Sequence, residues 1–218
     1  IDVTLRHSAR ARRLSLRVSR LDGRVTLTMP TRAPLREGIA FLETKESWLR
    51  KHLGAMRPAE VVAVGCTVPL RGQPVPVVVG EGRLARVTDG AIEVARGAPA
   101  APQVRAILRK LARDELAAAS DRYAVRLGRD YTRLTLRDTR SRWGSCTADG
   151  ALMYSWRLIM APPAVLDYVA AHEVAHLAEM HHQPAFWSIV ADLCPAYATH
   201  RTWLRDHGDS LHRVIFPD

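Results

Sequence analysis

HEVAHLAEMHH, residues 172–182, contains four histidines and two glutamates. The stretch from 162 to 180, which includes the first nine of these residues, is mostly apolar or small, a pattern that predicts a helix. On a helix, His172 and His176 would lie about 40° apart on one face, one turn along. Glu173, rotated by about 100° from His172, would reach a metal-bound water rather than the metal. This is the HExxH pattern, in which two histidines bind zinc and the glutamate acts as general base.

A catalytic zinc usually has a third protein ligand and one open position for water. No glutamate follows Glu179, and Glu179 itself would lie about 10 Å from His172 along a continuous helix. The histidine pair and Asp192 remain as candidates. A proline at 184 starts a new helix, so the chain must turn just before it. We therefore predict His182 as the third ligand of one Zn²⁺ per chain, with His181 as the alternative register.

The predicted secondary structure changes near the middle of the chain. Alternating strand patterns dominate its first hundred residues, and helical patterns dominate the remainder, which predicts an α+β fold. The connector GAPAAPQ, residues 97–103, is rich in Gly, Pro and Ala and is the best boundary between the two parts. We expect an amino-terminal β-rich domain at 1–97 and a second domain at 98–218.

The expected elements follow from the same periodicities. In the first part, strands at 13–19 and 24–30 flank the turn LDG at 21–23, and a single helix runs from Pro34 to about residue 56. The elements expected later are a helix at 103–128, a strand at 132–139, a loop at 140–150, a strand at 151–160, the helix at 162–180, and helices that start at Pro184 and Pro195, the last ending at Gly208.

Composition is that of a soluble globular protein, with 47% apolar and 25% charged residues among 218. No apolar run approaches the roughly 18 residues needed to cross a membrane, and the first residues do not resemble a secretory signal, so we expect a cytoplasmic protein. The net charge of +10 predicts either contact with a polyanion or nucleotide, or a generally basic surface. The three cysteines form no CxxC pair, so no cysteine zinc knuckle is predicted.

Several motifs together resemble one known family, the YgjP-like metallopeptidases, which are metal-dependent hydrolases related to SprT-like and WLM proteases. The resemblance runs nearly from end to end. The stretches that carry it most specifically are RSRWGSC (140–146), SWRLIMAPPAVLDYVAAHEVAHL (155–177), HHQPAFW (181–187) and PAYATHRTWLRDHG (195–208).

The resemblance implies a zincin-like α+β core in the carboxy-terminal half. It also implies that His172, His176 and His182 bind zinc and that Glu173 is the catalytic glutamate. Where the family commonly has Asn-His-Ser, this chain has His-His-Gln. His181 thus stands at the asparagine position, which supports His182 as the ligand.

The loop RSRWGSC follows a predicted strand and has two interpretations. In zincin-like proteins an edge strand near the metal often binds a peptide by strand addition. Arg142 and Trp143 would then line the substrate cleft. Alternatively, Trp143 packs in the interior and Arg142 pairs with Asp138 or Asp167.

Downstream aromatic and polar residues offer further roles. Phe186 and Trp187 are expected to form the wall and core beside the third ligand. Tyr197, Arg201 and His212 are candidates to stabilise negative charge on the substrate carbonyl.

The function predicted from these features is a zinc metallopeptidase acting on a peptide or protein. Zinc would lower the pKa of a bound water and polarise the scissile carbonyl, and Glu173 would transfer the proton to the leaving group. One alternative is a metal-dependent nucleoside triphosphate pyrophosphohydrolase, because arginine is in excess. Another is a nucleic-acid-associated binding module with a structural zinc, although a structural site is normally closed by four ligands. The sequence predicts no oligomeric state.

Overall fold

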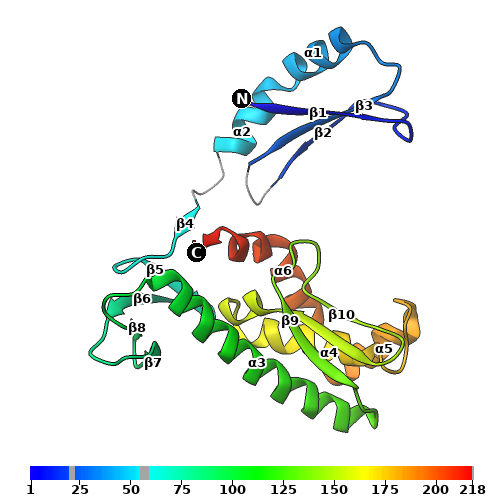
Figure 1. Cartoon of the computed structure of the whole chain (residues 1–218). Coiled ribbons are helices and arrows are strands. Elements are labelled where there is room, and N and C mark those ends of the chain that lie inside the picture. Colours follow the sequence, from blue (N-terminus) through cyan, green and yellow to red (C-terminus); the bar gives the residue numbers. More distant parts are fainter. Residues whose placement is uncertain (20–22, 55–58, 218) are drawn as a thin grey trace. The chain divides into compact units, whose positions relative to one another are not determined.

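The computed structural model describes residues 1–19, 23–54 and 59–217. The chain divides into two compact units, Ile1–Ala59 and Glu60–Asp218, shown in Figure 1. Both units mix helices and strands, so the α+β class is confirmed. Among the described residues, no helix is both long enough and apolar enough to cross a membrane.

The first unit is a three-stranded sheet that packs against two helices. Its elements are β1 (Val3–Ser8), β2 (Ser15–Val18), β3 (Val25–Pro30), α1 (Leu35–Thr44) and α2 (Glu46–Gly54). The strand order is β1-β3-β2, with β1 parallel and β2 antiparallel to the central β3. Val25, Leu27 and Met29 of β3 are buried. A Cβ on Gly38 of α1 would lie 2.7 Å from the Met29 sulfur, so the helix approaches the sheet closely because this position is glycine.

Two helices replace the single helix predicted from Pro34 to about residue 56. The break falls at Lys45, whose N–H bonds to the carbonyl of Leu42 at 3.0 Å, three residues back rather than four. The Thr44 hydroxyl donates to the Phe41 carbonyl at 2.7 Å and so occupies the acceptor that a continued helix would use. The strands predicted at 13–19 and 24–30 are confirmed as the antiparallel pair β2 and β3. Residues 21 and 22 of the predicted turn lie outside the described residues.

The second unit contains the longest helix and three small sheets. Its elements are β4 (Glu60–Val61), β5 (Thr67–Leu70), β6 (Gln73–Val79), β7 (Arg86–Thr88), β8 (Ala91–Val94), α3 (Ala100–Leu127), β9 (Arg133–Arg137), β10 (Gly144–Cys146), β11 (Ala151–Ser155), the 3₁₀ helix η1 (Trp156–Met160), α4 (Pro163–Ala175), α5 (Pro184–Leu193), α6 (Tyr197–His212) and β12 (Val214–Ile215). The sheets have the orders β5-β6-β8-β7, β10-β11-β9 and β12-β4.

Helix α3 is the longest helix of this unit and packs against α4 and η1. Its fully buried residues include Val104 and Leu108, which share one core with Ile92 and Val94 of β8. Strands β5 to β8 therefore belong to the same compact unit as the helices that follow. The two compact units meet between residues 59 and 60, whereas the sequence predicts a domain boundary between residues 97 and 98. The Gly/Pro-rich connector at 97–103 instead joins β8 and α3, which share one core.

The ends of two helices differ from expectation. Helix α4 ends at Ala175 instead of continuing to 180. Helix α6 continues to His212, whereas Gly208 was expected to end it. Gly208 instead allows close packing, since a Cβ there would lie 2.9 Å from the Trp143 ring. Its lack of a side chain therefore serves a helix–loop contact.

A buried arginine connects β9, η1 and the end of α6. Arg157 is only 9% exposed, and its guanidinium pairs with Asp138 at 2.6 Å. It also donates to the backbone carbonyls of Leu211 at 2.8 Å and Val214 at 2.9 Å. Four hydrogen bonds from the guanidinium, two of them to the Asp138 carboxylate, offset the cost of burying its charge. These bonds hold α6 beside the sheet that carries β10.

Candidate metal centre

Three histidines meet where α4 ends and the chain reverses. His172 lies in the last turn of α4, and His176 is the residue that caps the helix. The next residues form a turn, in which the N–H of Leu177 bonds to the carbonyl of Val174 at 2.9 Å. The reversal brings His182 back, so that its Nε2 lies 3.0 Å from Nε2 of His172. One ring nitrogen from each of the three histidines lies within 4.8 Å of the others.

This spacing suits a single metal ion. Nitrogens bound to tetrahedral zinc at about 2.1 Å are about 3.4 Å apart, which is within the range of the triad. The Glu179 carbonyl accepts a hydrogen bond from Nδ1 of His176 at 3.0 Å, which leaves Nε2 of that ring with its lone pair available. Nδ1 of His172 is buried and has no partner among the described residues.

Phe186 holds the three imidazoles together. Its ring centroid lies 4.9 Å from that of His172, 4.4 Å from His176 and 4.7 Å from His182. Phe186 is fully buried at the first turn of α5, as expected for a wall residue. The neighbouring Trp187 contacts the rings of His172 and His182 from the same helix. The triad is therefore supported by packing as well as by the backbone turn.

Burial favours the neutral form of His172 and His176, which is the form that metal binding needs. Burial, followed by the charges of His176 and His182, lowers the pKa of His172 to about 3. Burial also lowers the pKa of His176, despite the opposing hydrogen bond to Glu179. Metal binding requires neutral imidazole, so these rings need not lose a proton at neutral pH.

His181 does not join the cluster. It is exposed, and its backbone N–H donates to the Glu179 carboxylate at 3.0 Å. Helix α4 ends before Glu179, but the Glu179 carboxylate accepts the hydrogen bond from His181 and does not join His172, His176 and His182 in the candidate metal site. The geometry brings His182, rather than its neighbour, to His172 and His176.

Glu173 lies beside the triad and faces strand β10. Its side chain packs so closely on Gly144 that a Cβ added there would lie 2.5 Å from Oε1. Burial raises the pKa of Glu173 to about 8, although the positive charge of Arg142 opposes the shift. A buried carboxyl with a raised pKa is suited to accept and return protons.

A cavity of about 230 Å³ opens next to this carboxyl. It is lined by Arg142, Trp143, Gly144, Tyr168, Val169, His172, Glu173 and Leu204. The alternative partners expected for Arg142 are engaged elsewhere, because Asp138 pairs with Arg157 and Asp167 pairs with Arg122.

Trp143 has both of the roles considered for it. Besides lining the cavity, its ring stacks on His212 at a centroid distance of 5.0 Å and packs on Gly208 of α6. The aromatic ring therefore fixes the loop before β10 against the last helix. This contact positions the neighbouring Gly144 next to Glu173.

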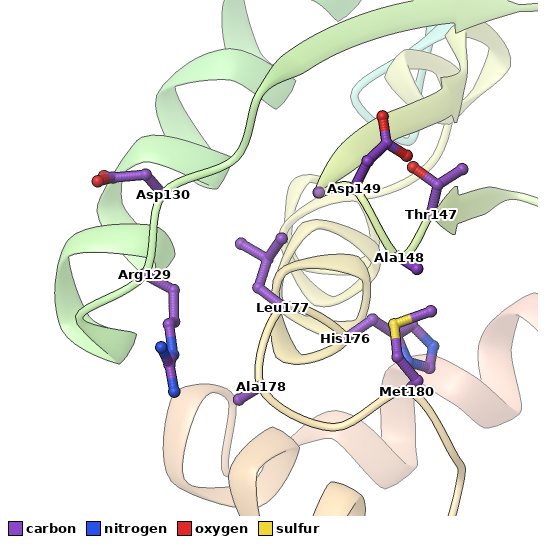
Figure 2. A pocket seen from close by; sticks show the side chains of 10 residues that line it. Arg129, Asp130, Thr147, Ala148, Asp149, His176, Leu177, Ala178 and Met180 are labelled. Atoms are coloured by element: carbon purple, nitrogen blue, oxygen red, sulfur yellow. The ribbon is translucent and has the colours of Figure 1, made fainter.

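A second hollow, of about 450 Å³, lies on the side of His176. Figure 2 shows it between the turn after α4, which carries His176, Leu177 and Met180, and the loop that carries Thr147 and Ala148. The first cavity borders the start of β10, and this hollow borders the loop after its end. Strand β10 therefore runs between two recesses.

Strand β10 is an edge strand with backbone groups on its open side. The N–H of Ser155 donates to the Trp143 carbonyl at 2.8 Å, and Ser145 is paired with Met153. Because alternate residues of an antiparallel pair bond to the partner, the N–H and C=O groups of Gly144 and Cys146 point away from β11. The sequence predicts a loop at 140–150 instead, because the three residues of β10 are too few to show the period of a strand.

Sequence reasoning did not identify Tyr168 or Leu204 as cavity residues. Tyr168 is 5% exposed, and its ring centroid lies 5.9 Å from that of His172. The available signal was its position four residues before His172, which places both side chains on one face of α4. Leu204 comes from α6, and only the tertiary fold brings it to the cavity.

Tyr197, Arg201 and His212 do not line the cavity beside Glu173. Tyr197 stacks on Trp187 with 5.5 Å between ring centroids, and the Arg201 guanidinium lies 4.6 Å from the centre of the same ring. His212 stacks on Trp143, and burial together with the charge of Arg157 lowers its pKa to about 4.

A histidine triad with a buried glutamate beside it is the arrangement found in zinc-dependent hydrolases. The model of the YgjP-like metallopeptidase domain matches residues 12–207, and the chain therefore belongs to the YgjP-like family. This membership confirms the resemblance drawn from the motifs.

Other comparisons add little. No protein with a curated description matches the chain. The crystal structure of the metallopeptidase zymogen of Pyrococcus abyssi abylysin matches at 16% sequence identity and a TM-score of 0.38, covering 43% of this chain and 95% of that chain.

Proposed function

We propose that this protein is a zinc-dependent metallopeptidase that cleaves peptide bonds in peptides or proteins. The observation that carries the proposal is the convergence of His172, His176 and His182 next to the buried carboxyl of Glu173. Zinc rather than magnesium or calcium fits three neutral imidazoles, because the latter ions prefer oxygen ligands. A structural zinc is disfavoured because no fourth His, Cys, Asp or Glu joins the group in the described parts of the chain.

The three histidines would hold one zinc ion, and Glu173 would move protons. Zinc bound there supplies a Lewis acid that polarises the scissile carbonyl and makes water acidic. Glu173 accepts a proton from the attacking water and gives it to the leaving nitrogen as the C–N bond breaks. Its burial against Gly144 excludes bulk water from the carboxyl and fixes its direction.

The substrate would bind as an added strand along β10. The outward backbone groups of Gly144 and Cys146 offer hydrogen bonds to an extended peptide. Because Gly144 touches Glu173, a peptide paired with it lies next to the catalytic carboxyl. Arg142 and Tyr168 border the same cavity and would contact the peptide near the cleaved bond.

The test combines metal analysis with peptide cleavage. Purified protein should contain about one zinc per chain, and it should cleave members of a mixed peptide library. Glu173→Gln should retain zinc and lower kcat by at least about 10³-fold, since it removes the general base. Asp192→Asn, which changes an exposed carboxylate on α5, is the matched control and should keep full activity. Zinc-loaded wild-type protein that cleaves no peptide would refute the proposal.

A nucleoside triphosphate pyrophosphohydrolase is the second candidate. The observation in its favour is Arg142, a guanidinium that lines the cavity beside Glu173. Against it, Glu173 is the only carboxylate that lines that cavity among the described residues, whereas Mg²⁺–nucleotide sites use carboxylates to hold the metal. Metal-dependent release of pyrophosphate, abolished in Glu173→Gln without any peptide cleavage by the wild type, would favour this function instead.

A further inference from the structure

The sheet of the first unit has one face that α1 and α2 do not cover. The side chains of Val25, Leu27 and Met29 point to the helices, so alternate residues point the other way. By the strand register, the residues on this outer face are Thr4, Arg6 and Ser8 of β1, Thr26, Thr28 and Pro30 of β3, and Ser15 and Arg17 of β2. Six of them form two rows across all three strands, Thr4-Thr26-Arg17 and Arg6-Thr28-Ser15, and we call these six residues the cationic face.

Every side chain of the cationic face is a hydroxyl or a guanidinium. Thr4, Arg6, Ser15 and Arg17 are exposed, and the two threonines of the central strand are half-buried. Strands β1, β2 and β3 contain no Asp or Glu. Within the part of the chain that the structure describes, neither Arg6 nor Arg17 forms an ion pair.

The positive charge of the whole chain is concentrated in this unit. Residues 1–59 contain 13 Lys and Arg against 5 Asp and Glu, a formal charge of +8. Residues 60–218 contain 19 against 17, a formal charge of only +2. A generally basic surface would spread the excess over both units, so the segregation requires a local explanation. It indicates an anionic partner for the first unit.

The two arginines are spaced for contact with a repeating polyanion. Arg6 lies opposite Thr28, and Arg17 lies opposite Thr26, on either side of the central strand. From strand spacing and rise, their Cα atoms are about 12 Å apart on a diagonal. Phosphates repeat along each strand of a duplex, so two guanidinium groups at this spacing can contact different phosphates. Arg10 and Arg12, in the loop after β1, are also exposed.

We propose that the cationic face binds the phosphate backbone of nucleic acid without reading its base sequence. Guanidinium and hydroxyl groups are the usual donors to phosphate oxygens. The face carries no aromatic side chain on which a base could stack, which argues against base-specific recognition of a single strand. An anionic membrane is less suited, because stable membrane binding usually adds apolar side chains or a lipid anchor to the positive charge, and none of these six side chains is apolar.

The experiment measures binding of the whole 218-residue chain to a fluorescein-labelled DNA duplex of about 20 base pairs. The double variant R6Q/R17Q should bind the duplex at least about tenfold more weakly near 100 mM salt. The slope of log K against log salt should decrease by about 2, because two phosphate contacts are lost. R83Q/R96Q removes the same charge from exposed positions of the second unit and should stay within about twofold of wild type.

The controls separate charge, folding and catalysis. R6K/R17K keeps the charge and should retain most of the affinity, whereas an equal loss in this variant would contradict the proposal. Equal weakening by R6Q/R17Q and R83Q/R96Q would also refute it, as would tighter binding to phosphatidylserine vesicles than to DNA. Peptide cleavage should be unchanged in R6Q/R17Q, and Glu173→Gln should keep its DNA affinity, so this inference and the proposed peptidase function can fail independently.

Discussion

At the scale of single residues, the candidate metal site depends on which of two adjacent histidines after α4 reaches His172 and His176. His181 and His182 are neighbours of the same type, but only the latter reaches Nε2 of His172. The zinc content of two alanine variants distinguishes them. His182→Ala should weaken zinc binding by more than about 100-fold, because losing a direct ligand costs more than losing an outer-shell partner.

His181→Ala is the matched control, because that residue contributes its backbone N–H rather than its ring to the turn. It should bind zinc within a few-fold of wild type. Equal zinc loss in both variants would show that the turn as a whole, and not the His182 ring, determines metal binding.

Gly144 is the second residue on which the site depends, because Glu173 occupies the space of a side chain. In Gly144→Ala the new Cβ would displace the carboxyl, whose Oε1 lies 2.5 Å from that position. A shift of about 1 Å at a catalytic group can cost about 100-fold in rate, so we expect kcat to fall by that order while zinc is retained. Gly54→Ala, at a helical site where no described atom outside its own helix lies within 4 Å of the added Cβ, should leave kcat unchanged.

At the scale of elements, the short edge strand β10 is proposed to bind the substrate. Cys146→Pro removes an N–H that points to the open edge and leaves the hydrogen bonds to β11 intact. We expect kcat/KM for an extended peptide to fall about three- to tenfold, the value of one hydrogen bond. Ser145→Pro removes an N–H that faces β11 and should instead lower the melting temperature.

Should Cys146→Pro cleave extended peptides as efficiently as wild type, the substrate does not pair with β10. The comparison with Ser145→Pro is informative because both variants place proline in the same three-residue strand. Only the direction of the lost N–H differs between them.

At the scale of the whole molecule, the Arg157–Asp138 pair connects the last helix to the site sheet. Burial acts to raise the pKa of Asp138, but the hydrogen bonds and charge of Arg157 outweigh it, so the pKa lies below its ordinary value. A depressed folded-state pKa gives stability that is complete above the unfolded value, near 4, and is lost as pH falls through the folded value.

Asp138→Asn should therefore lower the free energy of unfolding by about 1–2 kcal/mol at neutral pH. This value is smaller than that of a fully buried ion pair, because the Asp138 carboxylate is half-exposed and solvent screens its charge. Thermal unfolding between about pH 2 and 7 measures this. The difference between wild type and variant should shrink below about pH 4. A constant difference at all pH values would mean that the pair contributes packing rather than charge.

The sequence by itself determined the metal-binding motif and the class of fold. The i, i+4 spacing of His172 and His176 on a helix predicts two ligands on one face, because helical geometry is local. The same local rules gave the positions of α3, β9 and α5 and the α+β class. Proline at 184 required a turn before α5, which made His182 a candidate but left its neighbour open.

Tertiary structure decided how distant segments meet. It brought Gly144 of β10 against Glu173 of α4, placed the loop tryptophan on Gly208, and merged residues 60–97 into the core around α3. It also ended α4 at Ala175, so that His182 could return. Local periodicity cannot specify these features, because each depends on side chains from separate elements competing for the same space in a closely packed interior.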